Sequence, residues 1–305
     1  MTISAFEFSP SQFLKDVKFT TDLLGTDYSE SATRQVLGIY GRSFQEGAVL
    51  WRTTDKPGGA LNYRFYERRQ TDTVGAAVRG GLLNADNRAA DLISAWSSLY
   101  RGNSTELCDF DAALGLVKTW VYLGGLRPME EILGTPGVPR SLRRHEGLFR
   151  ALGLEAVRHV AVDYQRDTAN LYFRTAKALA PEECERLLSL TKSGPPDTAV
   201  FDDMAAFTAP NGYTFSVTMS IGTGEVERVA FYALRLPAGQ FPRVGERLTA
   251  FFASAPSYDD EEMNAVAWSF GKGNNYIKAE RSYCGRLVSL MREWNSPMTD
   301  PNRTR

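Results

Sequence analysis

Five short segments with the composition of β-turns recur along the chain at nearly regular intervals. They begin at residues 55, 111, 165, 222 and 271, which are 56, 54, 57 and 49 residues apart. Glycine and asparagine in such segments readily adopt positive φ, proline presets φ, and aspartate accepts hydrogen bonds from nearby backbone amides. The five predicted turns are Asp55–Gly59, Asp111–Ala113, Gln165–Asp167, Gly222–Gly224 and Gly271–Asn275.

Each predicted turn is flanked by two runs rich in aromatic and β-branched residues, which is the composition of β-strands. About 30 residues with helical periodicity separate successive hairpins, as in the spacing of Leu92, Ile93 and Trp96. The segment before the first hairpin is predicted to form two helices, with Gly25 ending the first and Ser29 capping the second. The paired runs are Ala48–Thr54 with Ala60–Glu67, Glu106–Phe110 with Leu116–Leu123, Val157–Tyr164 with Ala169–Arg174, Tyr213–Ile221 with Val226–Leu236, and Ala265–Phe270 with Tyr276–Tyr283.

The resulting unit, two helices followed by a hairpin, repeats five times and yields ten antiparallel strands. A twisted sheet of that size tends to close on itself, because closure removes its unpaired edges. We therefore predict an α+β fold: a ten-stranded antiparallel β-barrel with a solvent-filled lumen, ringed by α-helices. It forms one domain over residues 1–305, of which 296–305 are a flexible tail. The alternative (β/α)₈ barrel has parallel strands, which need long crossovers instead of tight turns.

Alternate residues of a strand point to opposite faces of its sheet, and in this chain one face is apolar while the other is basic and aromatic. In the second predicted strand, Arg64 and Tyr66 share one face, and Tyr63 and Phe65 share the other. The apolar face must pack beneath the helices, so the polar face is either solvated in an open sheet or enclosed. Ten strands favour enclosure, and side chains do not fill a barrel of that width. We therefore predict that the polar face lines a lumen.

The predicted lumen gathers cationic side chains from several strands. Such a surplus is unfavourable in a confined space unless an anion fills it. A diphosphate fits, because arginine binds phosphate oxygens in pairs and lysine binds them as a point charge. Aromatic side chains from the strands can stack on an aromatic substrate or shield a carbocation. The cations are Arg52, Arg64, Lys118, Arg228 and Lys278, and the aromatic residues are Tyr66, Trp120, Tyr122, Tyr172, Tyr232 and Trp268.

Several other functions lack their sequence motifs. Neither the phosphate loop G-x-x-x-x-G-K-[ST] nor the nucleophile motif G-x-S-x-G occurs. His145 and His159 have no metal-ligand spacing and are interpreted as structural. The acidic pairs at 202–203 and 259–260 do not continue as D-D-x-x-D, the motif with which terpene-type enzymes hold Mg²⁺ on a diphosphate, and are interpreted as helix-terminal or solvated charges. We therefore expect cationic side chains in place of a metal, and no cofactor.

The net charge and the composition of the chain bear on its partners and its cellular location. The net charge of −1 gives no case for a nucleic-acid partner. No apolar run approaches the ~18 residues of a membrane span, and the N-terminus lacks the basic and apolar regions of a signal peptide. The three cysteines have no close partner in the sequence, as expected for reduced thiols. We expect a cytoplasmic monomer with no nucleic-acid or membrane partner.

Long segments of the predicted strands, together with one helical segment, carry a resemblance to a known family. They are Leu61–Phe65, Ala95–Tyr100, Lys118–Pro128, Ala169–Arg174, Val226–Leu234, Trp268–Gly271 and Lys278–Tyr283. With them the chain resembles the ABBA prenyltransferases, soluble aromatic prenyltransferases of bacterial secondary metabolism. The resemblance is closest to the branch that contains the aminocoumarin-pathway 4-hydroxyphenylpyruvate dimethylallyltransferase and related phenazine prenyltransferases. The family fold is a ten-stranded barrel of ααββ units, in agreement with the turn pattern.

The resemblance implies transfer of a prenyl group from an allylic diphosphate to an aromatic ring. Metal-dependent relatives carry an aspartate near residue 62, whereas this chain has Asn62 followed by Arg64, as in the metal-independent branch. Ser216 stands where some relatives have a tyrosine that contacts the diphosphate. The residues implied to bind the diphosphate are Arg52, Arg64, Lys118, Asn170, Tyr172, Arg228, Tyr232 and Lys278.

For the acceptor, Arg158 falls where an arginine meets a carboxylate, Glu280 falls where a glutamate faces the acceptor, and Trp268 is a candidate aromatic contact. Glu280 is also the candidate catalytic residue, which orients the acceptor and helps to remove the ring proton. The predicted reaction moves a dimethylallyl group from dimethylallyl diphosphate to a ring carbon of an aromatic acid, such as 4-hydroxyphenylpyruvate or a dihydrophenazine carboxylate, in antibiotic biosynthesis. The alternatives are geranyl transfer, transfer to oxygen or nitrogen, and a non-catalytic barrel that binds an aromatic acid.

Overall fold

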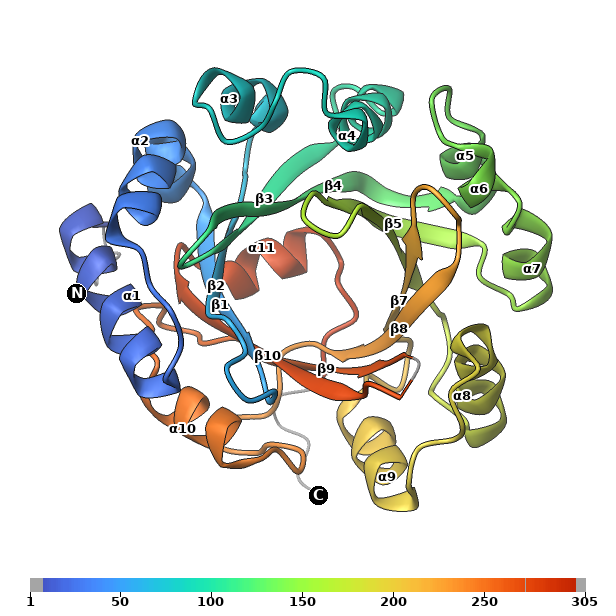
Figure 1. Cartoon of the computed structure of the whole chain (residues 1–305). Coiled ribbons are helices and arrows are strands. Elements are labelled where there is room, and N and C mark those ends of the chain that lie inside the picture. The colour runs from blue at the N-terminus through green and yellow to red at the C-terminus, as the bar shows by residue number, and fades with distance from the viewer. Residues whose placement is uncertain (1–7, 272, 300–305) are drawn as a thin grey trace.

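Ten antiparallel strands close into a barrel in the computed structural model, which describes residues 8–271 and 273–299 (Figure 1). Each strand pairs with its neighbours in the chain, and β1 pairs with β10 to complete the circle. The predicted ten-stranded antiparallel barrel is therefore confirmed. The strands are β1 (Ala48–Thr54), β2 (Asn62–Tyr66), β3 (Thr105–Asp111), β4 (Gly115–Pro128), β5 (Ala156–Asp163), β6 (Thr168–Arg174), β7 (Thr214–Ser220), β8 (Val226–Ala233), β9 (Asn264–Phe270) and β10 (Tyr276–Cys284).

The five predicted turns join the strands of the five hairpins, at residues 55–61, 112–114, 164–167, 221–225 and 271–275. Because consecutive strands run in opposite directions, all five turns lie at one end of the barrel, which we call the hairpin end. The segments that carry the helices leave and re-enter the barrel at the opposite end, which we call the helix end.

Helices surround the barrel as predicted, although the units are not identical (Figure 1). The third unit has three short helices, and residues 234–263 hold the single helix α10, because Pro237 and Pro242 interrupt the first half of that segment. The helices are α1 (Pro10–Leu24), α2 (Glu30–Glu46), α3 (Thr73–Arg79), α4 (Arg88–Leu99), α5 (Met129–Gly134), α6 (Arg140–Arg143), α7 (Glu146–Ala151), α8 (Pro181–Leu188), the 3₁₀ turn η1 (Ser189–Thr191), α9 (Thr198–Phe207), α10 (Glu246–Ser254) and α11 (Leu287–Glu293).

The predicted signals at the first two helices are confirmed. Gly25 follows α1 with φ of +57°, a left-handed conformation that glycine adopts without strain. The side chain of Ser29 accepts a hydrogen bond from the backbone N–H of Ala32 at 3.2 Å and caps α2. These caps fix where α1 and α2 begin and end against the outer face of the barrel.

The last helix, α11, closes the helix end of the barrel instead of joining the outer ring (Figure 1). Its Leu287, Leu290 and Met291 belong to a buried cluster formed by inward-facing strand residues. The carboxylate of Asp259 accepts hydrogen bonds from the backbone N–H groups of Arg286 and Leu287, at 2.7 and 3.1 Å. One of the acidic residues interpreted from the sequence as helix-terminal therefore marks the start of α11.

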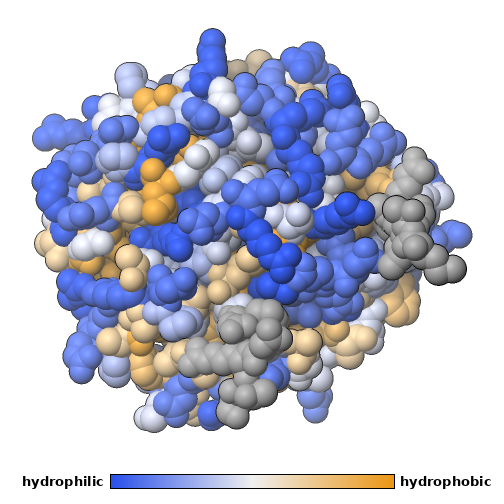
Figure 2. All heavy atoms as spheres, turned by 180° about the vertical axis from the view of Figure 1, so that it is seen from behind, coloured by the Kyte–Doolittle hydropathy of each residue, from blue (hydrophilic) through white to orange (hydrophobic). Residues whose placement is uncertain are grey.

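Apolar side chains divide into two buried clusters on the two sides of the sheet. The larger cluster lies between the strands and the helices, and the smaller one lies inside the barrel. Hydrophilic side chains predominate on the face seen in Figure 2, where apolar ones form small scattered groups. Within the described part of the chain, every helix is too short or too polar to cross a membrane.

The predicted tail, residues 296–305, is described only as far as Thr299. Met298 forms an isolated bridge with Leu234, and the backbone N–H of Thr299 donates to the carbonyl of Leu234 at 2.8 Å. Thr299 is 1% exposed. Residues 296–299 therefore pack against the barrel, and residues 300–305 lie outside the described residues.

Candidate active site

The lumen contains two cavities, one toward each end of the barrel. All five hairpins contribute residues to the hairpin-end cavity. The helix-end cavity lies beyond Arg64, Trp120 and Tyr172, and its other lining residues include Met263 and Met291. The inward face of the strands thus holds both sites, as strand alternation predicts.

The hairpin-end cavity has a surplus of positive charge. Its lining includes Arg52, Lys56, Lys118, Arg166, Arg228 and Lys278, but only three described carboxylates, Asp111, Asp163 and Glu227. Lys118 Nζ donates to Asn170 Oδ1 at 3.1 Å and lies 4.0 Å from Asp163 Oδ2. Burial lowers the pKa of Lys118 to about 7, although Asp163 opposes the shift. A bound anion would stabilise the charged form of this ammonium group.

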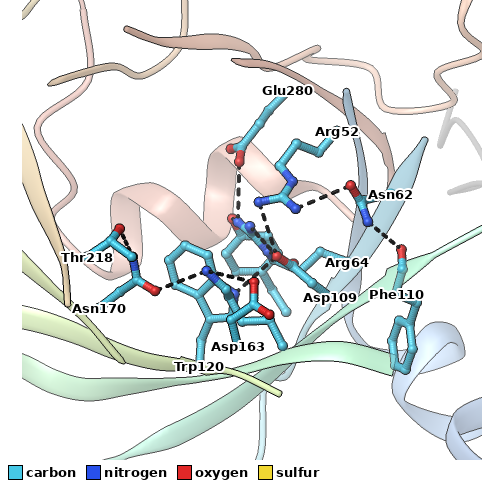
Figure 3. A network of polar contacts seen from close by, with 12 residues as sticks. Arg52, Asn62, Arg64, Asp109, Phe110, Trp120, Asp163, Asn170, Thr218 and Glu280 are labelled. Carbon is cyan, nitrogen blue, oxygen red and sulfur yellow. Dashed lines mark hydrogen bonds and ion pairs between the residues drawn. The ribbon is translucent and has the colours of Figure 1, made fainter. Parts of the chain in front are cut away.

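The amide of Asn170 links Lys118 to the next strand, because its Nδ2 donates to Thr218 Oγ1 at 2.5 Å (Figure 3). Burial also lowers the pKa of Lys278, and the nearby cations Arg52 and Arg228 add to the effect. Four of the predicted diphosphate cations, Arg52, Lys118, Arg228 and Lys278, therefore line one cavity with Asn170.

Arg64 and Asp109 form a buried ion pair between the two cavities (Figure 3). Arg64 Nη2 donates to Asp109 Oδ2 at 3.0 Å, its Nε donates to Oδ1, and its Nη1 donates to the hydroxyl of Tyr66 at 2.8 Å. Asp109 also lies 3.5 Å from Arg52 and accepts from Trp120 Nε1 at 3.2 Å. Burial alone would raise the pKa of Asp109, but Arg64 and Arg52 hold it at about 2.

Sequence reasoning missed Asp109, which organises the predicted cations. Its signal is the strand register, because Asp109 on β3 lies directly opposite Arg64 on β2. Opposite charges at facing positions of antiparallel strands attract one another. Lys56 and Arg166 were missed because they lie in the turns, outside the alternation of the strands.

Aromatic rings form a wall between the cavities. Trp120 stacks on Tyr172 with ring centroids 4.4 Å apart, and Tyr232 meets Tyr172 edge-on at 5.9 Å. The guanidinium of Arg64 lies 4.1 Å from the ring centroid of Trp120. Tyr172 and Tyr232, predicted beside the diphosphate, line the helix-end cavity, and Lys278 Nζ lies 5.8 Å from the ring centroid of Tyr232. Aromatic faces attract cations, so this wall can stabilise a positive charge placed between the two cavities.

Glu280 faces the same wall from β10. Its Oε1 lies 3.6 Å from Arg64 Nη1, and it lines the helix-end cavity (Figure 3). The candidate catalytic carboxylate and Trp120 therefore line the same cavity.

Arg158 lies in the helix-end cavity because β5 has a bulge. Val157 pairs with Phe173 and His159 with Tyr172, so Arg158 is an extra residue in the ladder. Arg158 and His159 both line the cavity, whereas Val157 and Val160 on either side belong to the outer cluster. Counted back from Val160, strict alternation would have placed Arg158 on the outer face.

The guanidinium of Arg158 is buried without an acidic partner among the described residues. Nη1 donates to the carbonyl of Asn295 at 3.0 Å, but Nε and Nη2 lack hydrogen-bond partners. Burial lowers its pKa to about 10. An unpaired buried cation of this kind is unfavourable unless a ligand supplies an anion.

The predicted role of Trp268 needs correction. Its side chain belongs to the outer cluster between barrel and helices, so it does not face the lumen. The alternation of β9 explains this, because Ala265 and Ala267 occupy the inward positions. Among residues 8–271 and 273–299, no group of three or more His, Cys, Asp or Glu side chains could hold a metal ion.

Comparisons with known proteins agree with this geometry. A family model described as "Aromatic prenyltransferase Orf2" matches residues 8–295. An aromatic prenyltransferase of Sclerotinia sclerotiorum is 49% identical over 298 residues, covering 96% of each chain. The 4-hydroxyphenylpyruvate 3-dimethylallyltransferase of Streptomyces niveus is 40% identical over 289 residues, covering 95% of this chain and 89% of that one.

The whole fold of this chain resembles that of solved structures. The prenyltransferase PriB, solved as a ternary complex with L-tryptophan and dimethylallyl thiolodiphosphate, has a TM-score of 0.61 at 11% identity. The match covers 97% of this chain and 99% of that one. At this level of identity the likeness supports the barrel architecture.

Proposed function

The chain belongs to the Orf2 family of aromatic prenyltransferases, and we propose that it moves a dimethylallyl group from dimethylallyl diphosphate to a ring carbon of a carboxylate-bearing aromatic acceptor. The acceptor class is that of 4-hydroxyphenylpyruvate or a dihydrophenazine carboxylate, and the product belongs to secondary metabolism such as antibiotic biosynthesis. One observation carries the proposal: a single lumen has a cationic surplus at one end and the unpaired Arg158 at the other.

The hairpin end would hold the diphosphate of the donor. Arg52, Lys118, Arg228 and Lys278 converge there with Asn170. As the donor's C–O bond loosens, negative charge builds on the leaving diphosphate, and these fixed cations stabilise it. The allylic carbon then lies toward the aromatic wall.

The aromatic wall would hold the allylic cation away from water. The rings of Trp120, Tyr172 and Tyr232 contact one another. Their faces attract a cation, and α11 closes the barrel beyond them. A dry chamber lets a ring carbon attack before water does.

The helix end would hold the acceptor. Arg158 supplies a buried guanidinium for its carboxylate, and a carboxylate would fill the hydrogen-bonding capacity that Nε and Nη2 leave unused. Glu280 reaches the same cavity and would orient the acceptor ring by a hydrogen bond. With the carboxylate anchored, the ring extends toward the wall and the donor.

We propose that the reaction needs no metal. Residue 62 is an asparagine, and the carboxylates nearest the wall, Asp109 and Glu280, both face the guanidinium of Arg64. Arg64 thus supplies fixed positive charge at the place where carboxylates would otherwise attract a divalent ion.

All of these residues come from one chain, so we also propose that the protein acts as a monomer. Its three cysteines are buried and unpaired, as in a reducing compartment, and we place the protein in the cytoplasm.

The test is incubation with dimethylallyl and geranyl diphosphates and a panel of aromatic acids in excess EDTA, read by mass spectrometry. We expect dimethylallyl transfer to carbon of an acceptor that bears a carboxylate. Activity that disappears in EDTA and returns with Mg²⁺ would contradict the metal-free scheme. A protein that binds the acids but never consumes a donor would be a binding barrel, contrary to the proposal.

A further inference from the structure

His159 is one of two histidines in the chain, and the bulge of β5 turns its ring into the lumen. Its ring centroid lies 5.2 Å from that of Tyr122, 5.9 Å from Trp294, 6.3 Å from Tyr172 and 6.5 Å from Trp120. The imidazole therefore lies among the aromatic residues of the helix-end cavity. Its interpretation from the sequence as a structural residue did not anticipate this position.

The imidazole of His159 is a base whose ring nitrogens are not engaged by another described residue. It forms no hydrogen bond with any other residue of the described ranges 8–271 and 273–299. Burial, together with the positive charges of Arg158 and Arg64, lowers the pKa of His159 well below its usual value. The ring is therefore neutral at physiological pH and has a nitrogen lone pair available to a ligand.

The carboxylates near the wall are in a different position. Asp109 accepts hydrogen bonds from Arg64 and Trp120 and faces Arg52. Glu280 faces the guanidinium of Arg64 at 3.6 Å. Asp109 is therefore a weakened base, because Arg64 and Arg52 stabilise its charged form and lower its pKa.

We propose that His159 is a catalytic residue that accepts the proton which the aromatic ring loses after prenylation. This inference rests on the proposed function. The donor's C–O bond breaks with its electron pair on the diphosphate, and a ring carbon of the acceptor then donates an electron pair to the allylic carbon. The C–H bond at that ring carbon breaks next and returns its electrons to the ring. The proton passes to an imidazole nitrogen of His159, which releases it to water as the product leaves.

The neighbouring position of Arg158 supports this assignment. A carboxylate on Arg158 fixes one end of the acceptor in the cavity that His159 also lines. The imidazole is a suitable acceptor despite its lowered pKa, because a ring that has just gained an alkyl group carries a full positive charge and is a far stronger acid than an imidazolium. Glu280 keeps the orienting role.

The test compares His159→Gln with the same substitution at His145, which lies outside the lumen with its ring nitrogen 2.6 Å from the carbonyl of Gly224. The substrates are dimethylallyl diphosphate and 4-hydroxyphenylpyruvate, with and without deuterium on the ring. For His159→Gln we expect a fall in product formation of about 10²-fold or more and a primary deuterium isotope effect that the wild-type protein lacks. The Kd for inorganic pyrophosphate stays at the wild-type value. His145→Gln behaves as the wild type in every measurement.

Two further variants keep the result interpretable. His159→Phe preserves the ring volume, and its circular dichroism and Tm show whether the barrel has folded. Glu280→Gln removes the other candidate base. An isotope effect that appears in Glu280→Gln but not in either folded His159 variant would overturn the inference. Wild-type turnover without loss in His159→Gln would also overturn it and leave the proposed function intact, whereas a wild-type protein that prenylates no acceptor would remove the proposed function itself.

Discussion

The two ends of the lumen differ in how they carry buried charge. At the hairpin end, several cations share a cavity with few carboxylates, and Arg166 and Lys56 reach it from the turns. At the helix end, Arg64 is paired with Asp109 and Glu280, whereas the guanidinium of Arg158 lies among aromatic rings beneath α11 without a carboxylate partner among the described residues. The first arrangement suits a ligand with several negative charges, and the second suits one with a single charge and an apolar body.

The wall between the ends would keep the two proposed ligands in separate places. Arg64, Asp109 and Trp120 contact one another and compensate their own charges. The wall therefore presents a π face and a balanced ion pair, whereas the cations beyond it remain short of counterions. A diphosphate gains more at the hairpin end, and an aromatic acid gains more at the helix end.

We expect the largest effect from a substitution that changes the hairpin end alone. Arg228→Ala removes one fixed cation from the donor's diphosphate, so kcat/KM for dimethylallyl diphosphate falls by about 10²- to 10³-fold. Lys118→Ala gives a similar loss. Steady-state kinetics with varied donor measures it. The control is Arg79→Ala, because the side chain of Arg79 is 72% exposed. We expect this variant to keep wild-type kinetics. Wild-type kcat/KM in Arg228→Ala would remove that residue from the site.

The next effect tests the wall. Asp109→Asn removes the buried counterion that Arg64 and Arg52 share and leaves Arg64 with Glu280 alone, which lowers the free energy of unfolding by about 3–5 kcal/mol. Urea unfolding measures it. Inorganic pyrophosphate should restore more stability to this variant than to the wild type, because an anion replaces the lost charge. Asp22→Asn, which alters an exposed ion pair, changes stability far less. Equal effects of the two substitutions would contradict the proposed role of Asp109.

We expect a smaller effect from a substitution at the helix end. Arg158→Met removes charge-assisted hydrogen bonds to the acceptor's carboxylate, so the Kd for 4-hydroxyphenylpyruvate rises by about 10- to 100-fold. The KM of the donor does not change. Without a ligand, the variant has a higher Tm than the wild type, because an unpaired buried cation is gone. An acceptor whose carboxylate is replaced by an amide should bind both proteins equally, and unequal binding would argue against the carboxylate contact.

The smallest effect is the pH dependence of the hairpin end. Burial places the pKa of Lys118 at about 7, against its ordinary value of 10.5. Between these values the folded protein binds fewer protons than the unfolded chain, so the free energy of unfolding rises with pH from about 7 to about 10.5 and is flat below 7. Lys118→Met should remove this rise.

Binding of an anion has the opposite pH dependence. Pyrophosphate favours the charged ammonium of Lys118, so its binding takes up a proton above pH 7 and its affinity falls as the pH increases. Calorimetry at pH 8 in buffers of different ionisation enthalpy measures the uptake. Uptake of the same size in Lys118→Met would assign it to another group.

The sequence predicted the barrel well because turn chemistry and strand alternation are local. The turn residues glycine, proline, asparagine and aspartate predicted all five hairpins. Strand alternation predicted the cations that face the lumen, which are Arg52, Arg64, Lys118, Arg228 and Lys278. Alternation with the register also puts Trp268 outside, and its prediction as an acceptor contact was wrong because it followed residue type and not strand face.

The remaining features depend on long-range geometry. A bulge in β5 turns Arg158 and His159 inward together, and no local signal in the sequence marks it. Asp109 becomes the partner of Arg64 only once β2 and β3 pair in register. The position of α11 at the helix end of the barrel depends on its apolar residues and on Asp259, whose carboxylate accepts hydrogen bonds from the backbone N–H groups of Arg286 and Leu287.

The most direct test of the two-ended lumen is calorimetric titration of inorganic pyrophosphate into protein saturated with 4-hydroxyphenylpyruvate. If the two anions occupy opposite ends, pyrophosphate binds with nearly the same Kd as it does to the free protein. Lys118→Ala then weakens only pyrophosphate, and Arg158→Met weakens only the acid. Competition between the two ligands would contradict the account, because it would place both at one site.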